Sequence, residues 1–413
     1  MNRDKQIRIL AELMRQLDEQ VNIDAGVQYR NPAEAYTSPA LAQQEWEHFF
    51  RNHPQMIGLS GHLPEPNSYF TIDDFGVPVL ATRDASGTFR AFVNACRHRG
   101  VRVANETKGI TARFMCPFHN WTYATNGDLV GVPRAHDFGN LDRSRHGLKE
   151  LPAQEKYGML WVHPQPEGKF DVDVMLGGLA EELSEWNFAD LVYVGESELR
   201  NDLNWKLAND TFGETYHFPR LHKETLGKLF YGDALVYEPF ERNHRFVWAN
   251  RGIDDLRGRP QSEWNYEHGA GWLYYLFPNV QLAGGGKSAS VIKIYPDGEN
   301  PGRSITRVGH YYCQELIEAS ANATHVMSRE TVYDPEQRAN AAPSIEATME
   351  IFDSTIEQED YLMGETTQQA VQSGLIDHVM FGRNEPALHH YHNTFRMALG
   401  QPLMEKIESK NKG

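Results

Sequence analysis

Residues 94–100 read Asn-Ala-Cys-Arg-His-Arg-Gly, and residues 115–121 read Met-Cys-Pro-Phe-His-Asn-Trp. Cys96 and His98 form a C-x-H pair, and Cys116 and His119 form a C-x-x-H pair. Each pair offers one thiolate and one imidazole, and a [2Fe–2S] centre in which two His replace two Cys on one iron needs these four ligands. Common zinc modules usually group two cysteines before two histidines. The mixed order therefore favours an iron–sulfur centre over a closed zinc site.

The composition limits the kinds of protein that this chain can be. Its 413 residues are too many for one ordinary core, so we expect two domains. Only three cysteines occur, which excludes a disulfide framework and fits a reducing compartment. The net charge of −16 disfavours nucleic acid and anionic membranes as partners. We see neither a transmembrane run nor a signal peptide, so we expect a soluble, cytoplasmic protein.

Periodicity divides the chain into three parts. Residues 1–51 are predicted to form helices that pack on the domain formed by residues 165–413. Residues 52–164 contain short strands separated by turns, which predicts a small all-β domain. Residues 165–413 contain longer strand candidates and two helical regions, at about 205–218 and 344–372; the strand candidates are 191–199, 234–240, 245–249, 271–282, 289–295 and 305–315. An antiparallel sheet with segregated helices belongs to the α+β class.

A second set of metal-ligand types lies in residues 204–222, which read Asn-Trp-Lys-Leu-Ala-Asn-Asp-Thr-Phe-Gly-Glu-Thr-Tyr-His-Phe-Pro-Arg-Leu-His. Glu214 and His217 are three residues apart and are expected on one helix face. Pro219 interrupts that helix, so His222 can also turn inward. Two imidazoles and a carboxylate placed facially leave open positions on Fe(II) for O₂ chemistry. The H-x₄-H spacing is weak by itself, but the upstream cluster motif strengthens it.

The third ligand is predicted to be a carboxylate from the second helical region. Apolar residues recur there at helical spacing and define a buried stripe: Ile345, Met349, Phe352, Ile356 and Met363. Asp360 lies within this stripe, where a carboxylate is costly unless it is paired or bound to a metal. Glu359 and Asp353 lie nearer the edges of the stripe and are alternative ligands. A helix that merely carries an acidic face is the other interpretation.

Residues 92–133 resemble the cluster-binding part of a Rieske domain. With the histidine pair downstream, residues 41–399 resemble the large (α) subunit of Rieske non-haem iron oxygenases, the aromatic-ring-hydroxylating dioxygenase family. That resemblance implies a catalytic domain in which a curved antiparallel sheet wraps around a long helix, a helix-grip-like fold. It assigns the [2Fe–2S] cluster to Cys96, His98, Cys116 and His119, and the mononuclear Fe(II) to His217, His222 and Asp360.

The same resemblance implies roles for two further carboxylates. Glu214 occupies the position of the electron bridge between a neighbouring subunit's cluster and this iron, where many members have Asp. The longer side chain can still hydrogen-bond one His from each subunit. Asp210 falls where some relatives have an Asn near the iron, and it is a candidate catalytic residue.

The implied activity is that of a terminal oxygenase component. Electrons from NAD(P)H would arrive through a separate reductase, with or without a ferredoxin, because the sequence lacks a nucleotide-binding fingerprint. A homotrimer, with or without small β subunits, is implied. We expect O₂-dependent hydroxylation of a small aromatic substrate. Oxidation or N-demethylation of a quaternary ammonium compound is the alternative within the family. Outside it, a cluster-only electron-transfer protein and a zinc-stabilised binding protein remain open.

Overall fold

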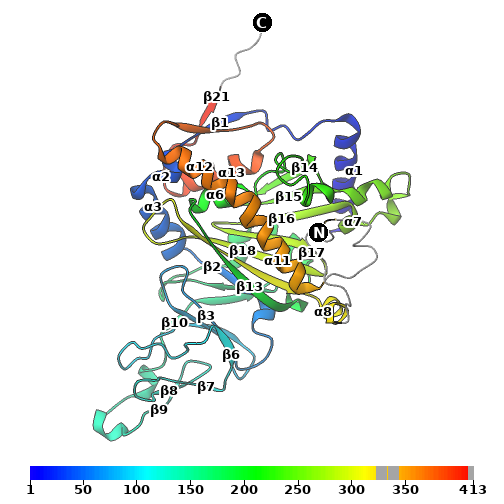
Figure 1. Cartoon of the computed structure of the whole chain (residues 1–413). Helices are drawn as coiled ribbons and strands as arrows, with labels where there is room; N and C mark the ends of the chain where they lie inside the picture. The colour runs from blue at the N-terminus through cyan, green and yellow to red at the C-terminus, as the bar shows by residue number, and fades with distance from the viewer. Residues whose placement is uncertain (322–332, 334–343, 408–413) are drawn as a thin grey trace. The chain divides into compact units, whose positions relative to one another are not determined.

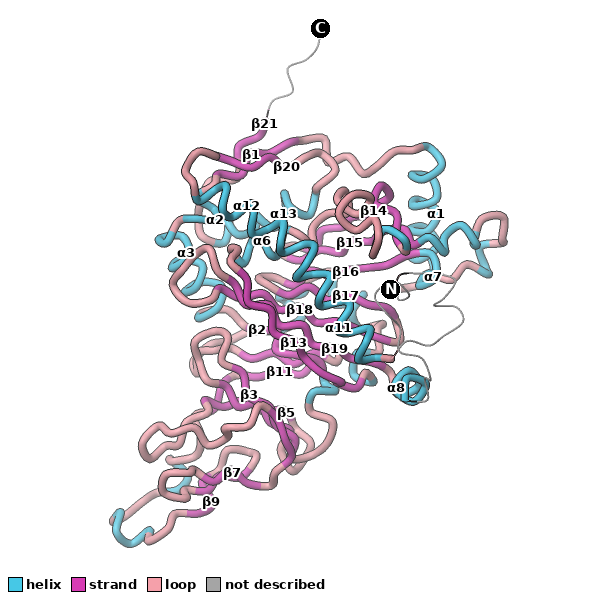
Figure 2. Tube along the Cα trace, viewed as in Figure 1, coloured by secondary structure: helices cyan, strands magenta, loops and turns pink. Residues whose placement is uncertain are grey.

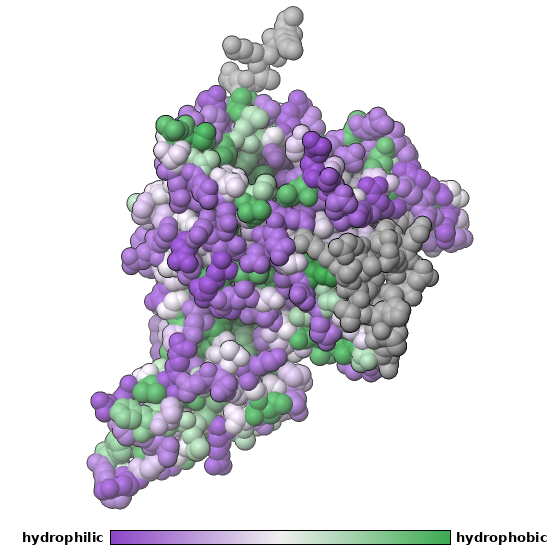
Figure 3. Space-filling model, in the orientation of Figure 1, coloured by the Kyte–Doolittle hydropathy of each residue, from purple (hydrophilic) through white to green (hydrophobic). Residues whose placement is uncertain are grey.

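The computed structural model describes residues 1–321, 333 and 344–407 (Figure 1). The chain folds into two compact units. The smaller consists of Glu45–Met175 and Asn187–Tyr193, and the larger consists of Met1–Gln44, Leu176–Trp186 and Val194–Gly413. Hydrophilic residues cover most of the face drawn in Figure 3, in keeping with the charge of −16. Among the described residues, no helix combines the length and apolarity needed to cross a membrane.

Short strands form the smaller unit, as the sequence predicts (Figure 2). One sheet has the order β10-β5-β4-β3-β6, and two three-stranded sheets have the orders β11-β12-β2 and β7-β8-β9. The strands are β2 (Gln55–Leu59), β3 (Ser68–Ile72), β4 (Val79–Arg83), β5 (Phe89–Val93), β6 (Lys108–Ile110), β7 (Arg113–Met115), β8 (Thr122–Ala124), β9 (Leu129–Gly131), β10 (Glu150–Leu151), β11 (Ala153–Lys156) and β12 (Met159–Val162). Gly127 closes the β8–β9 turn with a φ of +88°, and a Cβ there would lie 2.4 Å from the Phe92 ring. The turn therefore requires glycine.

A seven-stranded sheet forms the centre of the larger unit, in the order β13-β19-β18-β17-β16-β15-β14. Its strands are β13 (Val192–Asn201), β14 (Phe230–Phe240), β15 (Asn243–Asn250), β16 (Ala270–Leu276), β17 (Val280–Gly285), β18 (Ser288–Pro296) and β19 (Ser304–Tyr312). The pairs from β14 to β19 are all antiparallel. The predicted α+β class is confirmed.

The single strand expected over residues 271–282 is in fact two strands. Strand β16 ends at Leu276, and β17 begins at Val280 and pairs back on it. Pro278 lies in the connecting turn, where it lacks the N–H that a central strand needs. The side chain of Asn243 accepts the N–H of Phe277 at 3.0 Å, and the Tyr275 hydroxyl donates to the Pro278 carbonyl at 2.7 Å. These two bonds satisfy polar groups of the reversal.

The predicted helical region 344–372 is a continuous helix that crosses the sheet (Figure 1). It consists of α11 (Ile345–Thr355), a π-helical segment (Ile356–Tyr361) and α12 (Leu362–Gln372). The Ser344 side chain caps its start by accepting from the N–H of Ala347 at 3.1 Å. The wider π turns change the phase of the buried face. Asp360 is therefore buried, whereas Met363, expected on the same stripe, is 44% exposed.

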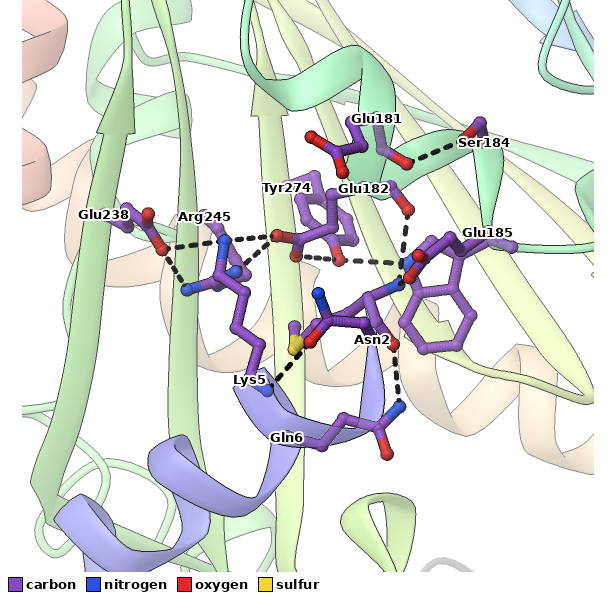
Figure 4. A network of polar contacts seen from close by, with 12 residues as sticks. Asn2, Lys5, Gln6, Glu181, Glu182, Ser184, Glu185, Glu238, Arg245 and Tyr274 are labelled. Carbon is purple, nitrogen blue, oxygen red and sulfur yellow. Dashed lines mark hydrogen bonds and ion pairs between the residues drawn. The ribbon is translucent and has the colours of Figure 1, made fainter.

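Helix α1 (Arg3–Glu19) joins the larger unit through a buried polar network (Figure 4). Glu182, on α5 (Leu179–Ser184), accepts from Lys5 Nζ at 2.8 Å and from the Tyr274 hydroxyl at 2.6 Å. It also accepts from Arg245 Nη1 at 2.5 Å, and both members of that pair are almost fully buried. The network ties α1 and α5 to strands β15 and β16.

Candidate metal centres

Cys96 and Cys116 begin two loops with the same backbone pattern. In each loop the Cys N–H donates to the carbonyl oxygen five residues on, at 2.8 Å in both cases. The Cys carbonyl accepts from the N–H four residues on, at 2.8 and 2.9 Å. The residues four positions on are Gly100 and Asn120, which have φ values of +76° and +57°. Left-handed backbone favours Gly and Asn, so the sequence builds two matching turns that each present one Cys and one His.

The four side chains of these loops fit a shared metal group. Cys96 and Cys116 are 3% and 2% exposed, and the rings of His98 and His119 are 4.6 Å apart between centroids. The Nδ1 atoms of both imidazoles are buried and have no hydrogen-bond partner among the described residues. Burial raises the pKa of the Cys96 thiol, and the Cys116 thiol raises it further. Two buried thiols beside two unsatisfied imidazole nitrogens are the donor set of a [2Fe–2S] centre.

Two aromatic residues surround this donor set. Trp121 is 2% exposed and stacks on His98, with centroids 5.1 Å apart. The Tyr123 hydroxyl lies 3.3 Å from Cys96 Sγ and accepts from the N–H of Arg97 at 2.9 Å, so its own proton is free to point at the sulfur. The sequence analysis did not single out Tyr123. Its signal was the position two residues after Trp121, on the same side of a short strand.

The second centre follows a helix that is shorter than predicted. The helical region expected over residues 205–218 contains only α6 (Trp205–Asp210), and turns follow it. The helix stops before Gly213, where an added Cβ would lie 2.6 Å from the side chain of Leu388. The sequence analysis expected Glu214 and His217 on one helix face. In the structure both lie in a turn. Glu214 Oε2 accepts the N–H of His217 at 3.1 Å and fixes that turn.

His217, His222 and Asp360 come together as the sequence analysis expected. One ligand atom from each lies within 4.8 Å of the others. The Nε2 atoms of both imidazoles are 3.2 Å from Asp360 Oδ1. Burial opposes charge on His217, but hydrogen bonds to Asp360 and Glu214 raise its pKa to about 10. Burial likewise opposes ionisation of Asp360, yet the two imidazoles lower its pKa. The site stabilises positive charge beside a carboxylate, and a divalent cation would meet both needs.

Each of these imidazoles uses its other nitrogen on a second carboxylate. His217 Nδ1 contacts Glu214, and His222 Nδ1 lies 2.7 Å from Glu359 Oε2. Thr225 donates to the same Glu359 oxygen at 2.8 Å. Carboxylates in this position fix the tautomer and orientation of metal-binding histidines. Glu359 was an alternative ligand in the sequence analysis, but it contacts the Nδ1 of His222. Its partner Thr225 was not predicted.

The remaining candidate carboxylates, Asp210 and Asp353, contact residues other than His217 and His222. Asp210 accepts from His392 Nε2 at 2.9 and 3.0 Å and from the Tyr36 hydroxyl at 2.7 Å. It shares the wall of a cavity of about 570 Å³ with Glu214 and Asp360. Asp353, the other alternative ligand, faces His310 at 3.0 Å.

The ligand-type residues border a second cavity, of about 360 Å³, in the larger unit. Trp248 lies at the centre of an aromatic cluster on its wall, with ring centroids 5.5 Å from Phe230, 6.0 Å from Phe246 and 6.5 Å from Phe218. Carboxylates of Glu214, Glu267 and Asp360 also line it, whereas none of the described lining residues is Lys or Arg. Trp248 is among the described lining residues, whereas four other aromatic residues of this sheet region are not: Trp272, Tyr274, Tyr275 and Phe277.

The fold and the two donor sets agree with two protein-family models. Residues 53–152 match the Rieske [2Fe-2S] domain, and residues 188–401 match the ring hydroxylating alpha subunit (catalytic domain). The chain belongs to this family of ring-hydroxylating α subunits and carries a Rieske domain, which confirms the predicted resemblance.

Individual relatives share about a third or less of their residues with this chain over the matched regions. The chain is 31% identical over 240 residues to the glycine betaine monooxygenase oxygenase subunit of Chromohalobacter salexigens, covering 57% of this chain and 51% of the relative. It is 28% identical to the chloroplastic choline monooxygenase of Spinacia oleracea, covering 69% and 64%. The matches thus span about half to two thirds of these relatives. The quaternary ammonium Rieske monooxygenase CntA in complex with L-carnitine has a similar fold, with a TM-score of 0.71, 18% identity and coverage of 92% and 97%.

Proposed function

We propose that this chain is the terminal oxygenase component of a multicomponent Rieske oxygenase. Three ligand-type atoms within 4.8 Å of one another, at the wall of an aromatic cavity, carry the proposal. His217, His222 and Asp360 would hold Fe(II), and Cys96, His98, Cys116 and His119 would hold the [2Fe–2S] cluster. Iron with two His and one carboxylate keeps positions open for O₂ and supplies the oxidation chemistry.

The protein residues around this iron site have separate tasks. Glu214 and Glu359 hold the Nδ1 atoms of the two imidazoles, so that both Nε2 atoms face the metal position. Apolar and aromatic side chains of the cavity exclude water and position the substrate beside that position. Glu214 also lines the neighbouring 570 Å³ cavity, which suits contact with another subunit.

A quaternary ammonium compound is the substrate class that the cavity favours. An aromatic cluster around Trp248 can hold a cation over ring faces, worth about 0.5–2 kcal/mol per contact. The carboxylate of Glu267 adds negative potential, and no described lining residue is a Lys or Arg that would repel a cation. Several curated relatives are named for choline or glycine betaine. The arene first expected from sequence fits the same rings but makes no use of the acidic lining.

We further propose a homotrimer that receives electrons from a separate NAD(P)H-dependent reductase, either directly or through a ferredoxin. Glu214 would be the residue that meets a neighbouring subunit's cluster-binding histidine. The family resemblance supports a separate reductase, and residues 1–413 carry no Gly-rich nucleotide-binding fingerprint.

Turnover by the iron-loaded full chain tests the proposal. The chain would be combined with a reductase and NADH, and O₂ consumption would be followed with trimethylammonium compounds and with arenes of similar size. Incorporation of labelled oxygen into product would be measured by mass spectrometry. Oxidation of ammonium compounds is expected, and it should disappear in His217→Ala while the visible spectrum of the cluster persists. Oxidation of arenes alone would overturn the substrate class, and no oxidation of either class would overturn the oxygenase assignment.

A further inference from the structure

Four polar side chains form a continuous hydrogen-bonded series in the larger unit. Asp353, on α11, accepts from the Ser197 hydroxyl on β13 and lies 3.0 Å from His310 Nε2 on β19. His310 Nδ1 lies 3.1 Å from the hydroxyl of Ser290, its cross-strand neighbour on β18. Ser290 and His310 both line the 360 Å³ cavity. The series therefore connects a buried carboxylate to a hydroxyl at the cavity wall.

An ionised Asp353 beside a neutral His310 would fix the direction of each hydrogen bond. An ionised carboxylate only accepts, so Ser197 and the Nε2–H of His310 both donate to Asp353. A neutral imidazole that carries its proton on Nε2 has a lone pair on Nδ1. The Ser290 hydroxyl then donates its single proton to that nitrogen. The Ser290 oxygen then presents its lone pairs to the cavity and can act there only as a hydrogen-bond acceptor.

We propose that Ser290 Oγ is an acceptor subsite that selects substrates with a hydrogen-bond donor, such as a hydroxyl group, over substrates with a carboxylate. The proposal rests on the proposed quaternary ammonium substrate. Asp353 and His310 are positioning residues. Asp353 orients His310, and His310 in turn sets the direction of the Ser290 hydroxyl. A substrate carboxylate would meet an oxygen lone pair here, with no described Lys or Arg in the cavity to offset the repulsion.

The sheet order also limits the length of the preferred substrate. Ser290 lies on β18 and Trp248 on β15, and three strand intervals separate these strands. Neighbouring strands are about 4.8 Å apart, so three intervals place β15 and β18 about 14 Å apart across the sheet. A trimethylammonium group on the aromatic cluster would thus have its donor group at the far end of an extended chain.

Equilibrium binding to the iron-loaded full chain tests the subsite. The probes are trimethylammonium salts with straight chains of two, four or six carbons that end in hydroxyl, methyl or carboxylate. At the length that fits, the hydroxyl probe should bind about 2- to 10-fold more tightly than its methyl counterpart, as one net hydrogen bond gives. The carboxylate probe should bind more weakly than both. Ser290→Ala should remove the hydroxyl advantage, and Ser290→Thr should retain it.

Ser288→Ala is the matched control, since it removes a second hydroxyl from the same strand and cavity wall. It should leave the ratio of hydroxyl to methyl affinity unchanged, and thermal unfolding of each variant checks that the fold is intact. Tighter binding of the carboxylate probe that depends on Ser290 would overturn the proposal, because Ser290 would then be a donor. Equal binding of hydroxyl and methyl probes at every length would overturn it as well. Failure of all trimethylammonium probes would instead overturn the proposed substrate class, and the subsite with it.

Discussion

Glu359 Oε2 lies 2.7 Å from Nδ1 of His222, on the side of the imidazole opposite the one that faces Asp360. Glu359 and Asp360 are neighbours in the π-helical segment, yet Glu359 contacts the Nδ1 of His222 and Asp360 contacts its Nε2. The helix thus supplies both the proposed metal ligand and the group that orients another ligand.

Glu359→Gln should weaken iron binding at the mononuclear site. The amide can donate to His222 Nδ1 and reverse its tautomer, which removes the lone pair that the metal needs on Nε2. Loss of such an orienting partner typically costs about 10- to 100-fold in metal affinity or activity. Titration of the iron-depleted mononuclear site with Fe(II) measures the change.

The control for this variant is Glu357→Gln, which changes an exposed carboxylate in the same segment. Its Fe(II) affinity should equal that of the unchanged protein. Equal affinities in both variants would show that Glu359 does not orient His222.

Metal analysis of anaerobically purified chain should give about three irons and two acid-labile sulfides per chain. Cys116→Ser should remove the sulfide and the visible colour, because it removes one of the two buried thiols. His217→Ala should retain the sulfide and lose one iron. Cys313→Ser serves as the control and should retain all three irons, since Cys313 lies outside both donor sets. Zinc without sulfide would contradict the cluster assignment.

The residues of the two candidate metal sites could be selected from the sequence because their types are chemically restrictive. Few sites need Cys and His in the spacings of residues 96–98 and 116–119, and a buried Asp360 inside an apolar stripe is costly unless it is paired or bound to a metal. Periodicity also predicted short strands before residue 165 and longer strands with a helix at 344–372 after it, so the α+β class was predicted correctly.

The sequence could not show contacts between distant segments. Glu359 and Asp353 looked equivalent as edge carboxylates, but one meets His222 and the other meets His310, which lie on different elements. The Leu388 side chain, from far along the chain, occupies the space beside Gly213 just after α6 ends. Helical periodicity carries no information about such a neighbour.

Asp210→Asn should lower the free energy of unfolding by about 1–3 kcal/mol. Asp210 accepts from Tyr36 on Oδ2 and from His392 on both carboxylate oxygens. Whichever oxygen the amide replaces, its NH₂ is a donor that faces another donor. Denaturant unfolding measures the loss. Tyr36→Phe, which removes one donor, should cost less. An unchanged stability with a strongly reduced kcat would instead place Asp210 in turnover, the role that the family resemblance suggested.

Arg245→Ala should destabilise the larger unit by about 3–5 kcal/mol, because it leaves Glu182 buried without its main partner. Arg15→Ala removes an exposed arginine that pairs with Glu12 and Glu19, and it should cost much less stability, because solvent screens exposed ion pairs. Thermal unfolding of both variants tests the difference. Equal losses would show that burial adds nothing to the Glu182–Arg245 pair.

The Glu182–Arg245 pair should also make stability depend on pH. Burial raises the pKa of Glu182, but Arg245, Lys5 and Tyr274 outweigh burial and hold it below its ordinary value of 4.5. A carboxyl with a lowered pKa in the folded state contributes stability above its unfolded pKa, and that stability is lost as the pH falls through the folded value. The free energy of unfolding should therefore decline below about pH 4.5. Glu182→Gln removes this proton uptake, so its decline over the same range should be shallower, as measured by denaturant unfolding at each pH. Parallel curves for the two proteins would mean that other carboxylates account for the acid sensitivity.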